Sequence, residues 1–279
     1  MEPLSAEIVS KELIASFFQP RQADSHKGTY GHALLVAGNK GKMGAAVLSA
    51  KACLRSGTGL LTVNAPEIFS SIIHVAVPEA MITAREEAID FSKYKSIGIG
   101  PGMGTDKIPA GILKNILSSF KGPVLIDADA LTILSEHKAW LSLIPEGAVL
   151  TPHPKEFDRL FGESATDAER AAKAISLSKT YPFVLILKGH HTLITSNGRA
   201  WYNQTGNAGL AKGGSGDVLT GMITALFAQS YTSLQAALMG VYLHGLAADI
   251  TLDQQSMESM LATDVIDNFG KAFKSLNVS

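Results

Sequence analysis

The sequence predicts an α/β protein with a large, mostly parallel β-sheet covered by helices. From residue 33 onward, short apolar runs bounded by glycine alternate with segments of helical periodicity. This alternation is typical of parallel strands joined by crossover helices. After residue 188 the rhythm changes, and two short apolar runs, Thr192–Thr195 and Ala200–Asn203, flank the turn Ser196-Asn197-Gly198. That spacing predicts an antiparallel hairpin at the edge of the sheet.

The first elements follow from local patterns. About residues 5–18, charged and apolar residues alternate at helical spacing, which predicts an amphipathic helix rather than a signal or transit peptide. Ala33–Ala37 is the first expected strand, followed by a glycine-rich turn and a helix from about Gly44 to Ser56. Gly57 ends this helix before a strand at Leu60–Asn64. Together these segments form a βαβ unit with a right-handed crossover.

The rest of the chain continues the same alternation. Further strands are expected at Ala80–Thr83, Ser96–Gly100, Val124–Asp127, Ala148–Thr151 and Phe183–Lys188. Helices are expected at Ile108–Phe120, Lys155–Phe161, Asp167–Tyr181, Val218–Ala228, Ala236–Ile250 and Thr263–Phe273. The helix over 236–250 is apolar nearly all round, which is typical of a buried helix. No repeat, low-complexity tract or linker divides the chain, so residues 1–279 are expected to form one domain.

Composition excludes several classes of partner. The 279 residues carry a formal net charge of −1, and 46% of them are hydrophobic, so neither nucleic acid nor a membrane surface is an expected partner. No apolar run approaches the roughly 20 residues that span a bilayer. The only cysteine, Cys53, excludes a disulfide within the chain and argues against a cysteine-based zinc site. A reducing cytoplasm and a small ligand are therefore expected.

The most informative segment is the glycine-rich stretch Gly206–Asp217, which contains five glycines and leads into the apolar run Val218–Ala228. Backbone amides in such a turn, and in the first turn of the helix that follows, are suited to bind an anion such as phosphate. Asp217 would repel that anion unless it has a chemical role, so it is the candidate catalytic base. The alternative is that Asp217 only caps the helix.

Ligands of open parallel sheets bind beyond the carboxyl ends of the strands. The segment Gly38–Ala46 and the loop Pro101–Gly104 both follow expected strands and are rich in small residues. Each could receive a ligand, and each could equally serve helix packing or a tight turn. Asp127 and Asp129 follow the strand at 124–126. One of them is expected to cap a helix, and the other could hold a magnesium-bound water.

Two further strand ends carry candidate side chains. His153 stands between two prolines, so we expect it to face the cleft and contact ligand, whereas Glu156 is either a first-turn acid or a residue that orients a metal-bound water. The segment Lys188–Thr192 offers an amine, open backbone and a hydroxyl for a nucleotide. Adjacent His190 and His191 point opposite ways in an extended segment, which argues against a metal site. His244 is interpreted as a core histidine.

The segment Asn207–Gly221 resembles the signature of the ribokinase-like superfamily, which implies a three-layer α/β/α fold, an anion hole and an aspartate base. Within that superfamily, the ordered motifs resemble those of NAD(P)H-hydrate dehydratases. The motifs that carry this resemblance are His26–Gly28, Gly44–Ala46, Leu54–Leu60, Gly100–Gly104, Asp127–Leu131, Thr151–Pro154 and Leu187–Thr192. The chain departs from the family pattern at Asn39, Met43 and Lys155, where many relatives have serine, an aromatic residue and glycine.

The resemblance implies nucleotide-dependent dehydration of the S epimer of NADH hydrate or NADPH hydrate, with ADP, split to AMP and phosphate, preferred over ATP. It also implies Mg²⁺, with ligands that the residues leave open, and a homotetramer. The hydrate would contact Ala45, Gly102, Gly104, His153 and Asp217. The nucleotide would contact Lys188, Gly189, His190, His191, Thr192 and Gly216. The anion hole would consist of Gly213, Gly214, Ser215 and Gly216.

Two other functions are compatible with the same motifs. A kinase of the superfamily acting on a vitamin precursor, such as a hydroxymethylpyrimidine or hydroxyethylthiazole, would use the same loop but release a stable phosphoester. A nucleotide-binding sensor without turnover is less consistent with the sequence, because it has no need of Asp217 as a base.

Overall fold

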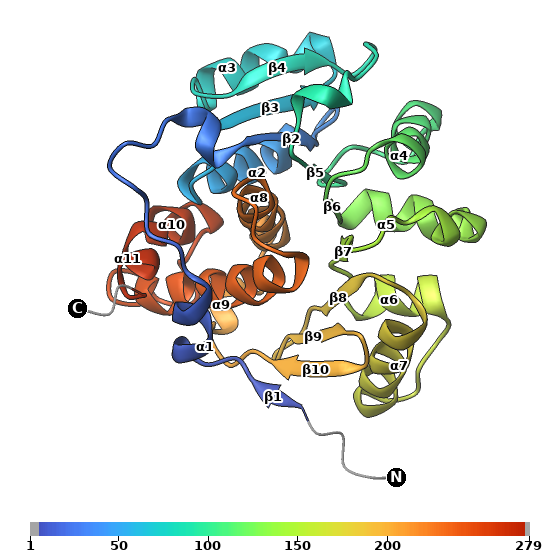
Figure 1. Cartoon of the computed structure of the whole chain (residues 1–279), viewed down its shortest axis with the longest axis vertical. Helices are drawn as coiled ribbons and strands as arrows, with labels where there is room; N and C mark the ends of the chain where they lie inside the picture. The colour runs from blue at the N-terminus through green and yellow to red at the C-terminus, as the bar shows by residue number, and fades with distance from the viewer. Residues whose placement is uncertain (1–5, 277–279) are drawn as a thin grey trace.

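The computed structural model describes residues 6–276 and arranges them around a 10-stranded sheet (Figure 1). The strand order across the sheet is β1-β10-β9-β8-β7-β6-β5-β2-β3-β4. The strands are β1 (Glu7–Ile8), β2 (His32–Val36), β3 (Leu60–Ala65), β4 (Met81–Ala84), β5 (Ser96–Ile99), β6 (Val124–Ile126), β7 (Val149–Leu150), β8 (Val184–Leu187), β9 (Leu193–Ser196) and β10 (Arg199–Tyr202). All pairs from β4 to β8 are parallel, whereas β9 is antiparallel to both β8 and β10. The predicted mostly parallel sheet is confirmed.

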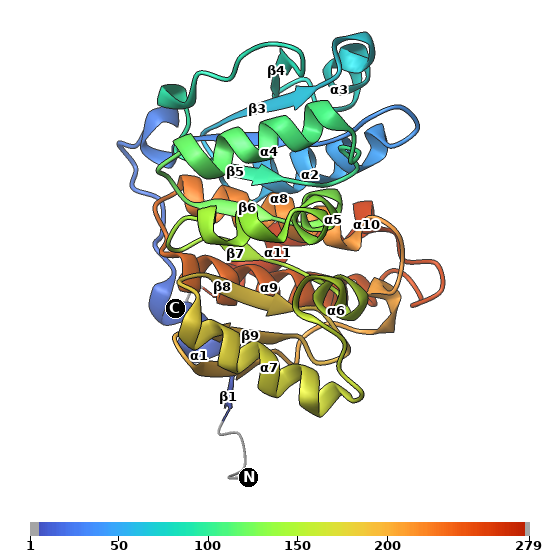
Figure 2. The same cartoon turned by 90° about the vertical axis from the view of Figure 1, so that its right-hand side faces the viewer.

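Helices cover both faces of this sheet, as Figures 1 and 2 show. One face carries α1 (Lys11–Phe17), α2 (Met43–Arg55), α3 (Ser70–Ala76), α8 (Ser215–Ala228), α9 (Ser233–Thr251), α10 (Ala262–Asp267) and α11 (Phe269–Lys274). The other carries α4 (Lys107–Ser119), α5 (Ala128–Glu136), α6 (Pro154–Phe161) and α7 (Asp167–Thr180). The three-layer arrangement is therefore as expected. None of the helices in the described part of the chain has the length and apolarity needed to cross a membrane.

The N-terminal prediction was wrong in part, because a strand precedes the helix. β1 pairs in parallel with β10, and the Glu7 carboxylate accepts a 2.6 Å bond from Nη2 of Arg199. α1 begins only after Ser10, whose hydroxyl accepts from the amide of Leu13. The outermost strand at this end is thus β1 and not the hairpin, and the part of the predicted helix before residue 6 lies outside the described residues.

The last predicted helix, 263–273, is two short helices that meet at Asn268. The Asn268 amide is buried and donates to the hydroxyl of Thr251 and to the carbonyl of Asp264. The bond to Thr251 holds the junction against α9. The sequence patterns did not predict α3. For α5 they predicted only a helix cap at Asp127 or Asp129, after β6.

The position of α8 is set by glycines that allow close contact. A Cβ on Gly221 would lie 2.1 Å from the carbonyl oxygen of Ser49 on α2, so only glycine lets the two helices approach this far. Gly98 of β5 meets Thr224 of α8 in the same way. Every residue of α8 from Val218 to Ala228 is buried. The first turn of α8 consequently sits at the carboxyl ends of the strands, facing the start of α2.

Candidate active site

The glycine-rich turn before α8 lies between two cavities at the carboxyl edge of the sheet. The small cavity has a volume of ≈ 400 Å³ and is lined by Gly41, Lys42, Gly44, Ala45, Leu48, Gly102, Asp129, Gly213, Gly214 and Asp217. The large cavity has a volume of ≈ 670 Å³, and its lining includes His153, Lys188, Gly189, His190, Thr192, Gly213, Ser215, Gly216 and His244. The turn thus separates most of the predicted hydrate contacts from most of the predicted nucleotide contacts.

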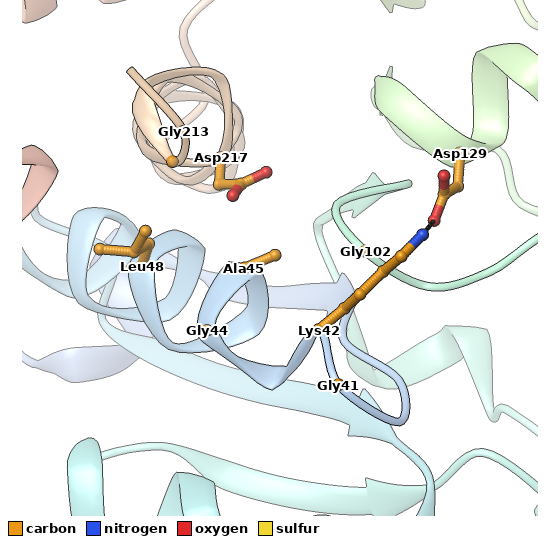
Figure 3. A pocket seen from close by; sticks show the side chains of 10 residues that line it. Gly41, Lys42, Gly44, Ala45, Leu48, Gly102, Asp129, Gly213 and Asp217 are labelled. Carbon is orange, nitrogen blue, oxygen red and sulfur yellow. Dashed lines mark hydrogen bonds and ion pairs between the residues drawn. The ribbon is translucent and has the colours of Figure 1, made fainter.

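The small cavity is bounded by the start of α2, the loop after β5 and the first turn of α8 (Figure 3). Gly102 packs closely on α2, because a Cβ there would lie 3.0 Å from the Cβ of Ala45. An ion pair of 3.3 Å between Lys42 Nζ and Asp129 Oδ2 lies at one side of this cavity. The same Asp129 oxygen accepts a 2.8 Å bond from the amide of Gly104. Asp217 projects from α8 into this cavity beside Ala45.

The turn itself is built to present backbone amides. Gly214 adopts a left-handed conformation with φ 96°, and its carbonyl accepts from the amide of Val218 to begin α8. The amides of Ser215, Gly216 and Asp217 precede the Val218 amide, which is the first donor within the helix, and so have no intrahelical partner. They lie at the positive end of the helix dipole. This arrangement suits a phosphate group between the two cavities.

Lys188 supplies a cation next to these amides. A Cβ on Gly216 would lie 3.5 Å from its Nζ, and Nζ donates a 2.8 Å bond to Asp127. Asp127 is 1% exposed and also accepts from the hydroxyls of Thr151 and Thr220 at 2.7 and 2.9 Å. Burial acts to lower the pKa of Lys188, but attraction by Asp127 and other carboxylates outweighs it and raises that pKa. Lys188 is therefore charged at neutral pH.

The environment of Asp217 gives it the properties of a base. Burial, and then repulsion by Asp127, raises the pKa of Asp217 from 3.8 to about 6, although Lys188 acts in the opposite direction. A carboxylate with this pKa is mostly ionised at pH 7 and is a stronger proton acceptor than an ordinary aspartate. Asp217 lies in the first turn of α8, but the N-cap residue of this helix is Gly214, so Asp217 is not the capping residue.

Comparison with known proteins decides the family. A sequence model of NAD(P)H-hydrate dehydratases matches residues 33–271. The chain belongs to this family. It is 36% identical over 274 residues to the ADP-dependent (S)-NAD(P)H-hydrate dehydratase of Bacillus subtilis, covering 95% of this chain and 97% of that one. It is also 34% identical to the bifunctional NAD(P)H-hydrate repair enzyme Nnr of Thermofilum pendens, over 92% of this chain and 52% of that relative. The chain spans about half the length of the bifunctional relatives that it matches.

Solved structures support the same assignment. The crystal structure of the Bacillus subtilis ADP/ATP-dependent NAD(P)H-hydrate dehydratase, co-crystallised with ATP and Mg²⁺, aligns with a TM-score of 0.88 at 32% identity. The alignment covers 99% of this chain and 100% of that structure. The predicted ribokinase-like fold is confirmed, because solved structures of that class align with nearly the whole chain.

Three of the predicted contact residues do not share a cavity with the other residues predicted to contact the same ligand. His153 lines the large cavity with Lys188 instead of joining Ala45 and Gly102. Its side chain is 47% exposed, and Nδ1 accepts from the Glu156 amide while the Glu156 carboxylate accepts from the His153 amide. Gly104 and His191 are not among the residues lining either cavity. The Gly104 amide instead binds Asp129, and His191 is exposed.

His244 lines the large cavity and is 7% exposed. Burial, and then the charge of Lys188, lowers the pKa of His244 to about 4, so its ring is neutral at pH 7. Its Nε2 has no hydrogen-bond partner among the described residues. The interpretation as a core histidine therefore fits its burial, but the ring also borders the cavity.

Sequence reasoning missed the residues that anchor the glycine-rich stretch. Asp249 of α9 accepts from the amide of Gly206 at 2.8 Å and from the side chain of Asn207 at 3.0 Å. Lys212 donates to the carbonyls of Glu258 and Met260. An acid in an otherwise apolar helix was the available signal for Asp249, because such an acid must find a buried partner.

No cluster of three or more His, Cys, Asp or Glu side chains that could hold a metal ion occurs between residues 6 and 276. Asp127 is occupied by Lys188 and the two threonines. Asp129 and Asp217 both line the small cavity and offer carboxylate oxygens, the ligands that Mg²⁺ prefers. The site therefore fits a magnesium ion that is held mainly by nucleotide phosphates and water, with one or two carboxylates added.

Proposed function

We propose that this protein dehydrates the S epimer of NADH hydrate or NADPH hydrate, using ADP in preference to ATP and releasing AMP and phosphate. The name of the Bacillus subtilis relative, which is similar over nearly its whole length, supports the reaction and the nucleotide. The observation that carries the proposal is Asp217. A carboxylate with a pKa of about 6 stands at an amide-rich helix start, between one cavity suited to a hydrate and another suited to a nucleotide.

In this mechanism Asp217 takes the proton from the C6 hydroxyl of the hydrate while the hydroxyl oxygen attacks the terminal phosphorus of ADP. AMP leaves with the electrons of the broken P–O bond. Phosphate then departs from C6 with the C–O bond electrons and a proton leaves C5, which restores the dihydronicotinamide ring. The cost of burying its charge and the repulsion by Asp127, which raise the pKa of Asp217, are both relieved when it accepts the proton. The elimination of phosphate needs little from the protein, which acts mainly on the phosphoryl-transfer step.

The amides of the glycine-rich turn and the ammonium of Lys188 stabilise charge on the transferred phosphoryl group. Each well-placed donor of this kind contributes about 3 kcal/mol to transition-state stabilisation. Leu219, Val241 and Gly245 line the large cavity further along α8 and α9 and offer an apolar surface to the rest of the nucleotide. Lys188, Gly189, His190, Thr192 and Gly216 are the proposed nucleotide contacts that this cavity brings together.

The proposed hydrate contacts are Ala45, Gly102 and Asp217, which line the small cavity. We propose His153 as a contact near the phosphates, since it shares the large cavity with Lys188. Gly104 acts through Asp129 in this proposal, and His191 acts only through the backbone of its loop. When bound with the nucleotide, Mg²⁺ would neutralise phosphate charge and orient the terminal phosphoryl group.

The test is to incubate purified protein with NADH hydrate or NADPH hydrate and either ADP or ATP, and to identify all products. The proposal predicts the dihydronicotinamide together with free phosphate and AMP, faster with ADP than with ATP. A stable phosphoester of a vitamin precursor, with no change in the hydrate, would instead identify a small-molecule kinase. Tight ADP binding without phosphate release from any substrate would identify a sensor.

The organisation of the protein is also proposed. We propose a homotetramer of single-domain chains in the cytoplasm. Ile68 and Val75, in neighbouring segments of the chain, are 82% and 85% exposed, which is consistent with a contact between copies. Cys53 is buried and unpaired, as is usual in reducing compartments. Light scattering tests the tetramer, unfolding through one cooperative transition tests the single domain, and cell fractionation tests the location.

A further inference from the structure

Arg85 is a buried cation with no role in the chemistry described above. It follows β4 at the edge of the sheet and is only 4% exposed. Burial lowers the pKa of Arg85 to about 10, so it stays charged at neutral pH. A buried charge is costly compared with a hydrocarbon side chain of similar size. Its retention at this place therefore points to the contacts that its guanidinium makes.

These contacts join three separate segments at the carboxyl edge of the sheet. Nη2 of Arg85 donates to the carbonyls of Ala37, directly after β2, and of Asn64 in β3, at 2.8 and 3.0 Å. Nη1 donates at 2.9 Å to the carbonyl of Met103, in the loop after β5. Because a guanidinium is planar and its donors have a fixed geometry, these bonds set the spacing of the segments.

The loop after β2 and the loop after β5 are also joined by hydrogen bonds that do not come from Arg85. The side-chain amide of Asn39 donates at 3.0 Å to the carbonyl of Met103, which is also the acceptor for Arg85. The amide of Gly38 donates at 2.8 Å to the carbonyl of Pro101. The loop after β2 and the loop after β5 therefore form one hydrogen-bonded unit with Arg85 behind it.

This unit forms the wall of the small cavity that faces Asp217. The loop after β2 leads to Ala45, and the loop after β5 contains Gly102, whose hypothetical Cβ lies 3.0 Å from that of Ala45. Figure 3 shows both residues at this cavity. A change in the separation of the loops would displace a bound molecule relative to the Asp217 carboxylate, and misplacement by about 1 Å can cost about 100-fold in rate.

We infer that Arg85 is a positioning residue for the hydrate: it acts through the Met103 carbonyl to hold Gly102 and Ala45 at the distance that aligns the hydroxyl with Asp217. The inference rests on the proposed function for the identity of the ligand. Arg85 itself does not line the cavity. Its partners Ala37 and Met103 belong to the loops that border the small cavity. Its effect is therefore confined to hydrate binding and does not extend to the nucleotide side, where Lys188 and Gly216 lie.

Two variants test the inference, because they remove different donors to one carbonyl. Arg85→Met and Asn39→Ala should each lower kcat/KM for the hydrate by about tenfold or more, with KM for ADP changed by less than about twofold. Arg85→Lys should recover part of the loss, since its ammonium retains a donor for one carbonyl. The matched control is Arg55→Met at the exposed end of α2, which should match the wild type in both parameters.

Hydrogen exchange provides a readout that does not depend on activity. Arg85→Met should speed amide exchange in peptides covering 38–46 and 100–105, and leave the peptide covering 213–217 unchanged. Equal losses for hydrate and ADP, or unchanged kinetics and exchange in folded Arg85→Met, would overturn the inference. If Arg85→Met does not fold, Arg85→Lys, which keeps the charge but only part of the hydrogen bonds, decides by the same measurements. If the wild type does not convert the hydrate, the proposed function fails while exchange still decides the role of Arg85.

Discussion

Replacing Asp217 with asparagine should abolish most turnover and yet make the folded protein more stable at neutral pH. Asparagine keeps the shape of the side chain but removes its charge. In the folded protein, burial and the nearby Asp127 raise the pKa of Asp217 from 3.8 to about 6. Between these two values the folded state binds more protons than the unfolded state, so the stability of the wild type falls as pH rises. A shift of about two pKa units corresponds to about 3 kcal/mol.

The variant should therefore exceed the wild type by about 2–3 kcal/mol in free energy of unfolding at pH 8. The difference should shrink as pH falls from about 7 to 4, because Asp217 of the wild type becomes protonated and is then neutral, as asparagine is in the variant. Urea unfolding at a series of pH values measures this directly. Turnover of the hydrate should fall by about 100-fold or more. Equal stability of the two proteins at every pH, or a less stable variant at pH 8, would refute the electrostatic reasoning.

Three further predictions concern the same site. Lys188→Ala should cost about 3 kcal/mol of stability, because it leaves the Asp127 carboxylate buried without its cation. Adding Asp127→Asn should restore the free energy of unfolding, measured in urea, but should not restore ADP binding, measured by calorimetry. Full recovery of ADP binding in the double variant would contradict this prediction. Gly214→Ala should destabilise the protein by about 1–3 kcal/mol, since φ is 96° at this position and the new Cβ would meet Leu48. Gly213→Ala is the control and should remain stable, because there is open space around its Cβ. Similar melting temperatures for the two variants would argue against backbone strain at Gly214. Finally, kcat/KM should fall as pH drops below about 6 through protonation of Asp217, and a flat profile from pH 7.5 to 5 would exclude it as the base.

Much of the fold could be predicted because the apolar runs of parallel strands and the glycines between them are local signals. The carboxyl ends of such strands meet at one edge, so the sequence predicts that Ala45, Gly102, Lys188 and Asp217 lie near one another. The structure shows which of the two cavities each residue lines. The place of His153 in the large cavity could not be predicted, because a strand-end position identifies the edge but not the side of α8.

Other features depend on contacts between distant parts of the chain. β1 has two residues, and its pairing with β10 relies on a partner far along the chain and on the bond between Glu7 and Arg199. The break at Asn268 depends on the buried hydroxyl of Thr251. The carbonyl partners of Arg85 come from three other segments. Local propensity contains no information about such partners, so these features required the structure.

The most direct test of the central claim is the recovery of dihydronicotinamide absorbance when the hydrate is mixed with ADP and Mg²⁺, with wild type and Asp217→Asn measured side by side. The proposed role of Asp217 predicts that the wild type restores the absorbance with one phosphate released per dihydronicotinamide formed, and that the folded variant restores almost none. A wild type that leaves the hydrate unchanged, or a variant as fast as the wild type, would contradict the claim.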